Sequence, residues 1–429
     1  MNRIFLIIVL SAVCYAGWKQ FTVQPAADLP SPMEVLSSAM VDSAGGAVEL
    51  AIGLVGVMTL FLGLMKIAEA GGMLTILARL IRPLMARLFP EVPADHPAMG
   101  AMILNLSANA MGLGNAATPF GIRAMQELET LNRQPGTATN AMVLFLAINT
   151  SSVTLLPTGV IALRATAGST DPAIILPTTL FATICSTSVA ILAAKLYQRI
   201  SPLRDTHQAD EKKTDSANPG EISTLKAAQG AYPIWVSIMA LGALATLIPV
   251  AVLFGKGLSP WILPGLMAGF LVFGALRRVP IYEVFVDGAR EGFQVALRII
   301  PYLVAILVAV GMLRASGALD LLVGALSPIT RPFGLPAEAL PMALMRPLSG
   351  SGAYAILAAI INDPLIGPDS YTGILVSTLQ GSTETTFYVM AVYFGAVQVK
   401  RLRHAMAAAL TADAAGVIFA VLACWLFLG

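Results

Sequence analysis

Hydrophobic segments long enough to cross a lipid bilayer recur along the whole of this 429-residue sequence. A membrane-spanning helix needs about 20 consecutive, mostly apolar residues. Charged residues make up 12% of the chain, whereas they make up about 25% of a soluble domain. The sequence therefore predicts an all-α polytopic membrane protein whose first partner is the lipid bilayer. The net charge of +2 gives no indication of nucleic-acid binding.

One of these segments, Tyr371 to Val397, carries an uninterrupted polar run at its centre. The run, Gln380 to Thr386, reads Q-G-S-T-E-T-T and includes the carboxylate of Glu384. In hydrocarbon each such group costs free energy unless it has a partner. The helix is therefore either broken here or packed around something polar.

A second polar interruption lies in the segment Asn140 to Leu163, which carries N-T-S-S-V-T at its centre. Two interpretations stay open. The hydroxyl groups can bond back to their own helix while the asparagine joins neighbouring helices, or the helix can be broken at a binding site.

Two other segments are interrupted so early that neither of their arms can span a bilayer. After Pro97 the chain is apolar for only about eight residues before asparagine, serine and glycine follow. This pattern predicts a hairpin that enters the membrane and returns, with its tip near Asn109–Asn115 and its second arm starting at Thr118-Pro119. The sequence R-P-L-S-G-S-G, from Arg346 to Gly352, predicts a second hairpin of the same kind.

The remaining segments predict further helices, a loop and a linker. We expect an uncleaved first membrane helix, a polar loop over 20–44 and a helix over 46–67. Amphipathic helices are expected over 73–89 and 318–330, and further helices over 172–196, 232–254, 261–276, 295–313 and at the C-terminus. The polar stretch 198–230 predicts a cytoplasmic linker, so the domains are 1–197, 198–230 and 231–429.

The two halves repeat the same order of elements. NLSANA aligns with PLSGSGA, and NTSSVT aligns with QGSTETT, so that Val153 falls opposite Glu384. Arg3 and the basic residues of the loops place the N-terminus and the linker in the cytoplasm, although Arg314, Arg331 and Arg346 then lie outside. The opening helices of the two halves run in opposite directions, which is the inverted repeat of many secondary transporters.

Longer motifs make the sequence recognisable. DHPAMG, the run NLSANAMGLGNAATPFGIRAMQELETLN and NTSSVTLLPTGVIALR resemble spore maturation protein A. VPIYEVFVDGAREGF, GMLRASGALD, MRPLSGSGA and STLQGSTETTFYVMAVYFGAV resemble spore maturation protein B. The chain thus resembles a fusion of both families, which belong to the nucleoside-recognition or gate-domain group. That resemblance implies an architecture similar to concentrative nucleoside transporters, with the site at the hairpin tips and the broken helices.

We expect a transporter in the bacterial inner membrane that moves a small polar solute or ion, with Na⁺ or H⁺ as a possible coupling ion and no cofactor or metal. Glu384 is expected to bind the ion or solute, or to form a structural pair with Arg346. The alternative function is a non-transporting scaffold or receptor. An enzyme is disfavoured, since the sequence has neither HExxH nor GxSxG; whether it forms a homo-oligomer stays open. The predicted binding residues are Asn105, Ser107, Asn109, Asn115, Asn149, Thr150, Ser151, Thr154, Ser349, Ser351, Gln380, Ser382, Thr383, Glu384 and Thr385.

Overall fold

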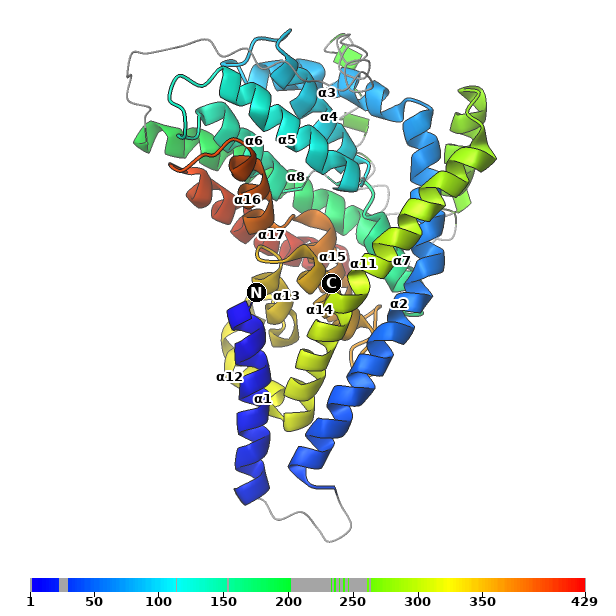
Figure 1. The fold of residues 1–429 in the computed structure, drawn as a ribbon, viewed down its shortest axis with the longest axis vertical. Coiled ribbons are helices and arrows are strands. Elements are labelled where there is room, and N and C mark those ends of the chain that lie inside the picture. The colour runs from blue at the N-terminus through cyan, green and yellow to red at the C-terminus, as the bar shows by residue number, and fades with distance from the viewer. Residues whose placement is uncertain are drawn as a thin grey trace.

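The computed structural model describes residues 2–22, 30–201 except 113 and 153, and 264–428, with isolated positions between 233 and 261. Its regular elements are helices (Figure 1). The first half holds α1 (Asn2–Thr22), α2 (Pro32–Ala70), α3 (Met73–Leu88), α4 (Pro97–Ala110), α5 (Gly114–Thr130), α6 (Asn140–Thr150), α7 (Thr158–Thr166) and α8 (Ile175–Ile200). The second half holds a helix over Pro264–Leu276, then α11 (Ile281–Ser316), α12 (Ala318–Thr330), η1 (Arg331–Phe333), η2 (Ala337–Ala339), α13 (Leu340–Met345), α14 (Gly350–Ile361), α15 (Tyr371–Ser382), α16 (Thr386–Ala396) and α17 (Ala405–Leu428).

The opening helices of the two halves, α2 and α11, lie side by side and antiparallel (Figure 1). Gly292 of α11 faces the backbone of Met58, whereas Gly311, later in α11, faces Ser43, earlier in α2. Small residues let two helices approach closely inside a membrane. The opposed directions agree with the inverted repeat.

The closing helices of the halves also pack on each other, and each reaches into the other half. α8 contacts α15, where the hydroxyls of Thr178 and Thr378 lie 2.7 Å apart. α17 in turn contacts α6. The two halves are therefore interleaved around one centre.

Within the described residues, three helices are long and apolar enough to cross a membrane alone: Phe5–Thr22, Ile175–Ile200 and Ala405–Leu428. Two bent pairs raise this number to five if each pair is counted as one span. The chain bends by 67° between α2 and α3 and by 78° between α11 and α12, where the amphipathic helices were predicted. The all-α architecture with two hairpins and two broken helices is confirmed.

Several predicted helix boundaries are wrong. α2 begins at Pro32, within the predicted loop, because Ser31 and Glu34 form a capping box that fixes the helix start. α11 begins at Ile281, and α8 continues to Ile200, which lies inside the predicted linker. The second arm of the first hairpin starts at Gly114, so that Pro119 lies inside α5 instead of at its start. Most of the linker and of the predicted helix 232–254 lies outside the described residues.

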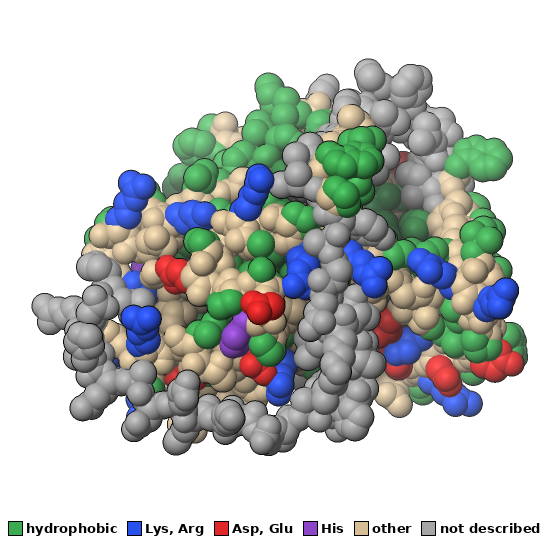
Figure 2. Space-filling model, turned by 90° about the horizontal axis from the view of Figure 1, so that it is seen from above, with side chains coloured by type: hydrophobic (Ala, Val, Ile, Leu, Met, Phe, Trp, Pro, Cys, Tyr) green, Lys and Arg blue, Asp and Glu red, His purple; other side chains and the backbone are tan. Residues whose placement is uncertain are grey.

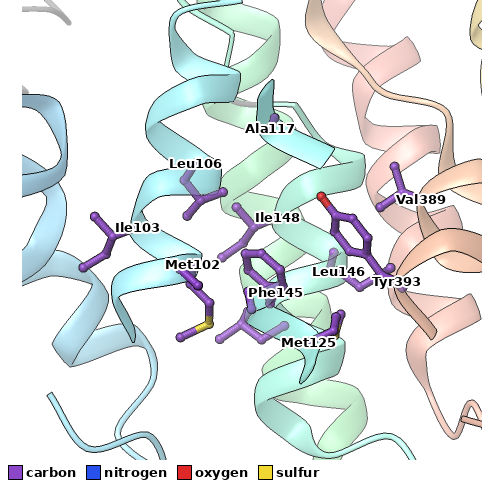
Figure 3. Packing of buried hydrophobic residues seen from close by; sticks show 14 of the residues in the cluster. Met102, Ile103, Leu106, Ala117, Met125, Phe145, Leu146, Ile148, Val389 and Tyr393 are labelled. Atoms are coloured by element: carbon purple, nitrogen blue, oxygen red, sulfur yellow. The ribbon is translucent and has the colours of Figure 1, made fainter. Parts of the chain in front are cut away.

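A hydrophobic cluster fixes the first hairpin against α6 and α16 (Figure 3). Met102 of α4 and Met125 of α5 are fully buried beside Phe145 of α6. The ring of Tyr393, from α16, stacks on Phe145 with centroids 5.8 Å apart and an interplanar angle of 8°. Such pairs contribute about 0.5–1.5 kcal/mol beyond the area they bury. This packing holds elements of both halves in fixed register at the centre.

Candidate functional site

Four interruptions of the helices meet in one place. Hairpin 1 (α4 and α5) turns between Ala110 and Gly114, and hairpin 2 (α13 and α14) turns at 346–349. Break 1 is the interval between Thr150 and Thr158 that separates α6 from α7, and break 2, residues 383–385, separates α15 from α16.

Backbone hydrogen bonds join these interruptions to one another. Leu155 N donates to Ala110 O at 2.9 Å, which joins break 1 to hairpin 1, and Phe387 N donates to Pro347 O at 3.0 Å, which joins α16 to hairpin 2. Glu384 N donates to Thr150 O at 2.9 Å and so joins the two breaks. Polar backbone groups inside a membrane must be satisfied within the protein, and here the interrupted segments satisfy each other.

A cavity of about 270 Å³ opens between the halves at this point. Four predicted residues line it: Asn109 and Thr154 from the first half, and Gln380 and Glu384 from the second. The cavity is also lined by Gly112, Leu156, Pro157, Thr158, Gly159, Val160, Arg346, Gly350, Tyr354 and Gly381.

The buried guanidinium of Arg346 dominates the electrostatics of the cavity. Only 5% of this residue is exposed. Its Nη1 donates to Thr385 Oγ1 at 3.0 Å, and its Nη2 donates to the carbonyl oxygens of Gln380, at 3.3 Å, and Thr383. These carbonyls belong to the C-terminal end of α15 and to break 2; in transporters with discontinuous helices, carbonyls freed at such a break coordinate a cation. A side-chain cation occupies that place.

Glu384 forms the structural pair with Arg346 and also faces the cavity. Its Oε2 lies 3.6 Å from Arg346 Nη2, so the structural pair is formed. Its side chain is nevertheless 39% exposed and lines the cavity.

The first half contributes a network of neutral amides. Asn109 Nδ2 donates to Asn149 Oδ1 at 2.9 Å, and the Tyr393 hydroxyl donates to the same oxygen at 3.3 Å. Asn105 Nδ2 donates to that hydroxyl at 2.9 Å and also to Ala117 O. Asn105 Oδ1 and the Ser107 hydroxyl are buried and have no hydrogen-bond partner within the described residues.

Other predicted residues serve the helices themselves. The hydroxyls of Thr150 and Ser151 donate to carbonyls three residues earlier in the chain, as the simpler interpretation of N-T-S-S-V-T expected. The Thr383 hydroxyl likewise donates to Leu379 O, four residues earlier. The Ser349 hydroxyl caps α14 by accepting from Gly352 N.

For three predicted residues, Ser351, Ser382 and Asn115, the structure describes no side-chain hydrogen bond. Ser351 is half-buried in α14, and Ser382 is buried with no hydroxyl partner in the described part of the chain. Asn115 lies in α5, but its side chain falls outside the description, as does all of Val153.

The prediction missed three buried polar residues. Arg164, which is fully buried on α7, binds the loop before α15, and Tyr354 lines the cavity and donates to Gly159 O. Asp413, only 7% exposed, accepts a hydrogen bond from Thr386. A charged residue inside an otherwise apolar segment was the signal available for Arg164 and Asp413.

The chain is similar to several known proteins. The Gate family, described as nucleoside recognition, matches residues 51–167 and 296–400. Spore maturation protein B of Bacillus subtilis is 45% identical over 172 residues, which cover 40% of this chain and 96% of that protein. Spore maturation protein A of the same organism is 44% identical over 165 residues, which cover 38% of this chain and 84% of that protein.

Two further similarities are weaker. Inner membrane protein YjiG of Escherichia coli is 32% identical over 84 residues, which cover 19% of this chain and 55% of that protein. A solved structure of a CNTnw variant in an intermediate state aligns over 98% of this chain and 90% of that chain, with 13% identity and a TM-score of 0.37.

Proposed function

Because this chain belongs to the Gate, or nucleoside-recognition, family and is a multi-pass membrane protein, we propose that it carries a small polar solute across the membrane. The observation that supports this most is the cavity between the halves, whose walls come from both hairpins and both breaks. Secondary transporters bind their solutes between inverted repeats at discontinuous helices.

The size and lining of the cavity restrict the class of solute. Its volume of about 270 Å³ lies at the lower end of ligand pockets, which span about 300–1,000 Å³. Asn109, Gln380 and Thr154 offer neutral donors and acceptors, while Arg346 and Glu384 offer one charge of each sign. This lining suits a small neutral or zwitterionic solute with several hydrogen-bonding groups, and a nucleoside, which the family description names, is of this kind.

We place the protein in the bacterial inner membrane with its N-terminus in the cytoplasm. Lys and Arg side chains spread over the face that carries α3 (Figure 2), and basic residues are enriched on the cytoplasmic side of membrane proteins. One relative is named an inner membrane protein. Which half corresponds to which spore maturation protein stays a prediction.

Uptake into proteoliposomes tests the proposal. Solutes are first selected from nucleosides, nucleobases, amino acids and small carboxylic acids by the thermal stabilisation they give to the purified protein. Glu384→Gln is then expected to reduce uptake about tenfold or more, since a hydrogen bond to a charged group contributes about 1.5–3 kcal/mol. Its membrane abundance should stay unchanged. The matched control is Glu283→Gln, the same change at an exposed position of α11, which should transport like wild type.

The scaffold alternative has its own supporting observation, the ion pair between Arg346 and Glu384, which suits a purely structural centre. A scaffold would be stabilised by no solute in the panel, and Glu384→Gln would then change only its stability. Full uptake by Glu384→Gln would contradict the role given to this carboxylate.

A further inference from the structure

Asp413 is a buried carboxylate that the proposed site does not use. It lies in α17, close to break 2, because Gly416, one turn later, faces the side chain of Thr383. Its Oδ1 accepts from Thr386 Oγ1 at 2.8 Å, whereas its Oδ2 is buried without a hydrogen-bond partner in the described part of the chain. An ionisable group held like this inside a spanning helix is unusual for a purely structural residue.

The charges around Arg346 do not balance if both carboxylates are ionised. Arg346 interacts electrostatically with Glu384 and with Asp413, but only Glu384 lies within ion-pair distance of it. One buried guanidinium then has to balance two carboxylates, the partly exposed Glu384 and the buried Asp413. An unpaired buried charge is costly, and the group becomes neutral or binds a cation instead.

A metal cation is the weaker of these two solutions. Inside transporters, Na⁺ is held by the carbonyls freed at broken helices. Here the carbonyls of Gln380 and Thr383 accept hydrogen bonds from Arg346 instead. A proton needs no such set of ligands, and a protonated carboxyl group is neutral, which lowers the cost of burying Oδ2 without a partner.

We infer that Asp413 binds and releases the proton that is coupled to solute movement; the coupling rests on the proposed function, whereas the proton on Asp413 does not. Arg346, with its contacts to break 2, acts as a built-in cation where another transporter would bind Na⁺. Movement of Arg346 with hairpin 2 away from Asp413 would favour the protonated carboxyl group. Movement towards Asp413 would favour the ionised one.

The surroundings of Asp413 leave Arg346 as its principal charged neighbour. α17 packs against α6, α8, α15 and α16, and among these α6 carries no titratable residue. The other titratable or charged groups on these elements, on α17 itself and beside them are Cys185, Lys195, Tyr197, Arg199, Tyr371, Glu384, Tyr388, Tyr393, Arg403, His404 and Cys424. Arg346, which lies in the turn of hairpin 2, is the charged group that acts on Asp413.

Infrared difference spectroscopy of the protein in lipid tests the proton directly. The wild type should show the C=O stretching band of a protonated carboxyl group at neutral pH, and this band should disappear in alkaline buffer. The band should be absent in Asp413→Asn and present in Glu384→Gln. Asp413→Glu should restore it, which guards against a loss caused by misfolding. Three outcomes would overturn the inference. The band could persist in Asp413→Asn, it could disappear only in Glu384→Gln, or NaCl could remove it at constant pH.

Solute flux separates this inference from the proposed function. With a solute taken from the panel, Asp413→Asn should lose accumulation driven by a pH gradient but retain exchange of labelled for unlabelled solute. Accumulation at the wild-type level in this variant would overturn the coupling role. If the wild type moves no solute although the infrared band is assigned to Asp413, the proposed function fails while the proton site stands.

Discussion

At the scale of single residues, Arg164 shows how a buried cation can join the two halves. It lies on α7, and Nη1 donates to Pro368 O at 2.6 Å and to Ser377 Oγ at 3.3 Å, both in the second half. Its Nη2 donates to Asp369 Oδ1 at 3.1 Å. The planar fork of a guanidinium reaches several acceptors at once, whereas the ammonium of lysine acts as a single point charge.

Arg164→Lys is therefore expected to destabilise the protein although the charge is kept. At least one buried acceptor would lose its donor, which costs about 1–3 kcal/mol. Thermal unfolding in detergent measures the effect, with Arg290→Lys, at an exposed position, as the control that should unfold like wild type. If both variants unfold at the same temperature, the geometry of Arg164 is unimportant.

The partner of Arg164 gives a pH dependence outside the membrane-spanning segments. Partial burial acts to raise the pKa of Asp369, but hydrogen bonds from Ser169 and Thr170 and the charge of Arg164 outweigh it and lower the pKa below its ordinary 3.8. A carboxyl group whose pKa is lower in the folded than in the unfolded state stabilises the fold fully at every pH above its unfolded-state pKa. This contribution is lost as the pH falls through its folded-state pKa.

The stability difference between wild type and Asp369→Asn should accordingly be constant near neutral pH and should shrink below about pH 3.8. The effect should be modest, because the Asp369 side chain is 38% exposed and solvent screens it. Unfolding temperatures measured across this range would provide the test. A difference that grows on acidification would have the wrong sign.

At the scale of the elements, the close contact of α2 with α11 depends on glycine. A Cβ built on Gly292 would lie 2.7 Å from Met58 O and 2.8 Å from Thr59 Cα, both of them backbone atoms. Gly292→Ala should therefore separate the helices and cost about 1–3 kcal/mol, as overpacking does, despite the higher helix propensity of alanine.

Gly269→Ala is the matched control for this prediction. Nothing lies within 4 Å of a Cβ built there, so the substitution should leave stability unchanged or raise it by up to about 1 kcal/mol. Unfolding temperatures and membrane abundance compare the two variants. Equal behaviour of Gly292→Ala and Gly269→Ala would show that the α2–α11 contact tolerates a methyl group.

The sequence predicts the interruptions of the helices better than their ends. Polar and glycine residues inside apolar segments mark both breaks, because hydrocarbon penalises them wherever they stand. The start of α2 escaped prediction because its capping box lies in a polar stretch that hydropathy assigns to a loop. The pairing of Arg346 with Glu384 was one of the two predicted roles, but the burial of Arg346 against break 2 was not predicted, since charge counting places this arginine outside the membrane.

The hydrogen bonds of individual hydroxyls are harder still to predict. Thr154 and Thr385 are opposite each other in the alignment of the two breaks, yet the first is hydrogen-bonded to Ser152 in its own break and the second accepts from Arg346. Both residues are threonines, so the residue type does not distinguish the two roles. Roles of this kind depend on distances between segments, which a sequence pattern does not contain.

At the scale of the whole molecule, a symmetric arrangement of helices encloses an asymmetric site. The alignment of NLSANA with PLSGSGA places Leu104 opposite Arg346, and Val153 is opposite Glu384. The charges of the cavity therefore come from the second half alone, while the first half lines the cavity with neutral groups such as Asn109 and Thr154. Neither half lines the cavity by itself, so the cavity depends on the association of the two halves.

This interdependence predicts the outcome of cutting the chain within residues 202–230. Each fragment alone should be degraded or aggregate, because it would expose the α2–α11 and α8–α17 contacts and lose the bond from Glu384 N to Thr150 O. Fragments made together should reassemble. The precedent is that two separate Bacillus subtilis proteins match 172 and 165 residues of this chain.

Copurification through a tag on one fragment, followed by the uptake assay, measures this reassembly. A cut inside α11 is the control, because it interrupts a helix that packs along α2 and should not be rescued by coexpression. Assembly of the fragments from the first cut should restore the bond from Glu384 N to Thr150 O and, with it, the response to Glu384→Gln. Stable accumulation of either fragment by itself would instead mean that each half folds independently and that the interleaved packing of α8 with α15 and α17 with α6 contributes little to stability.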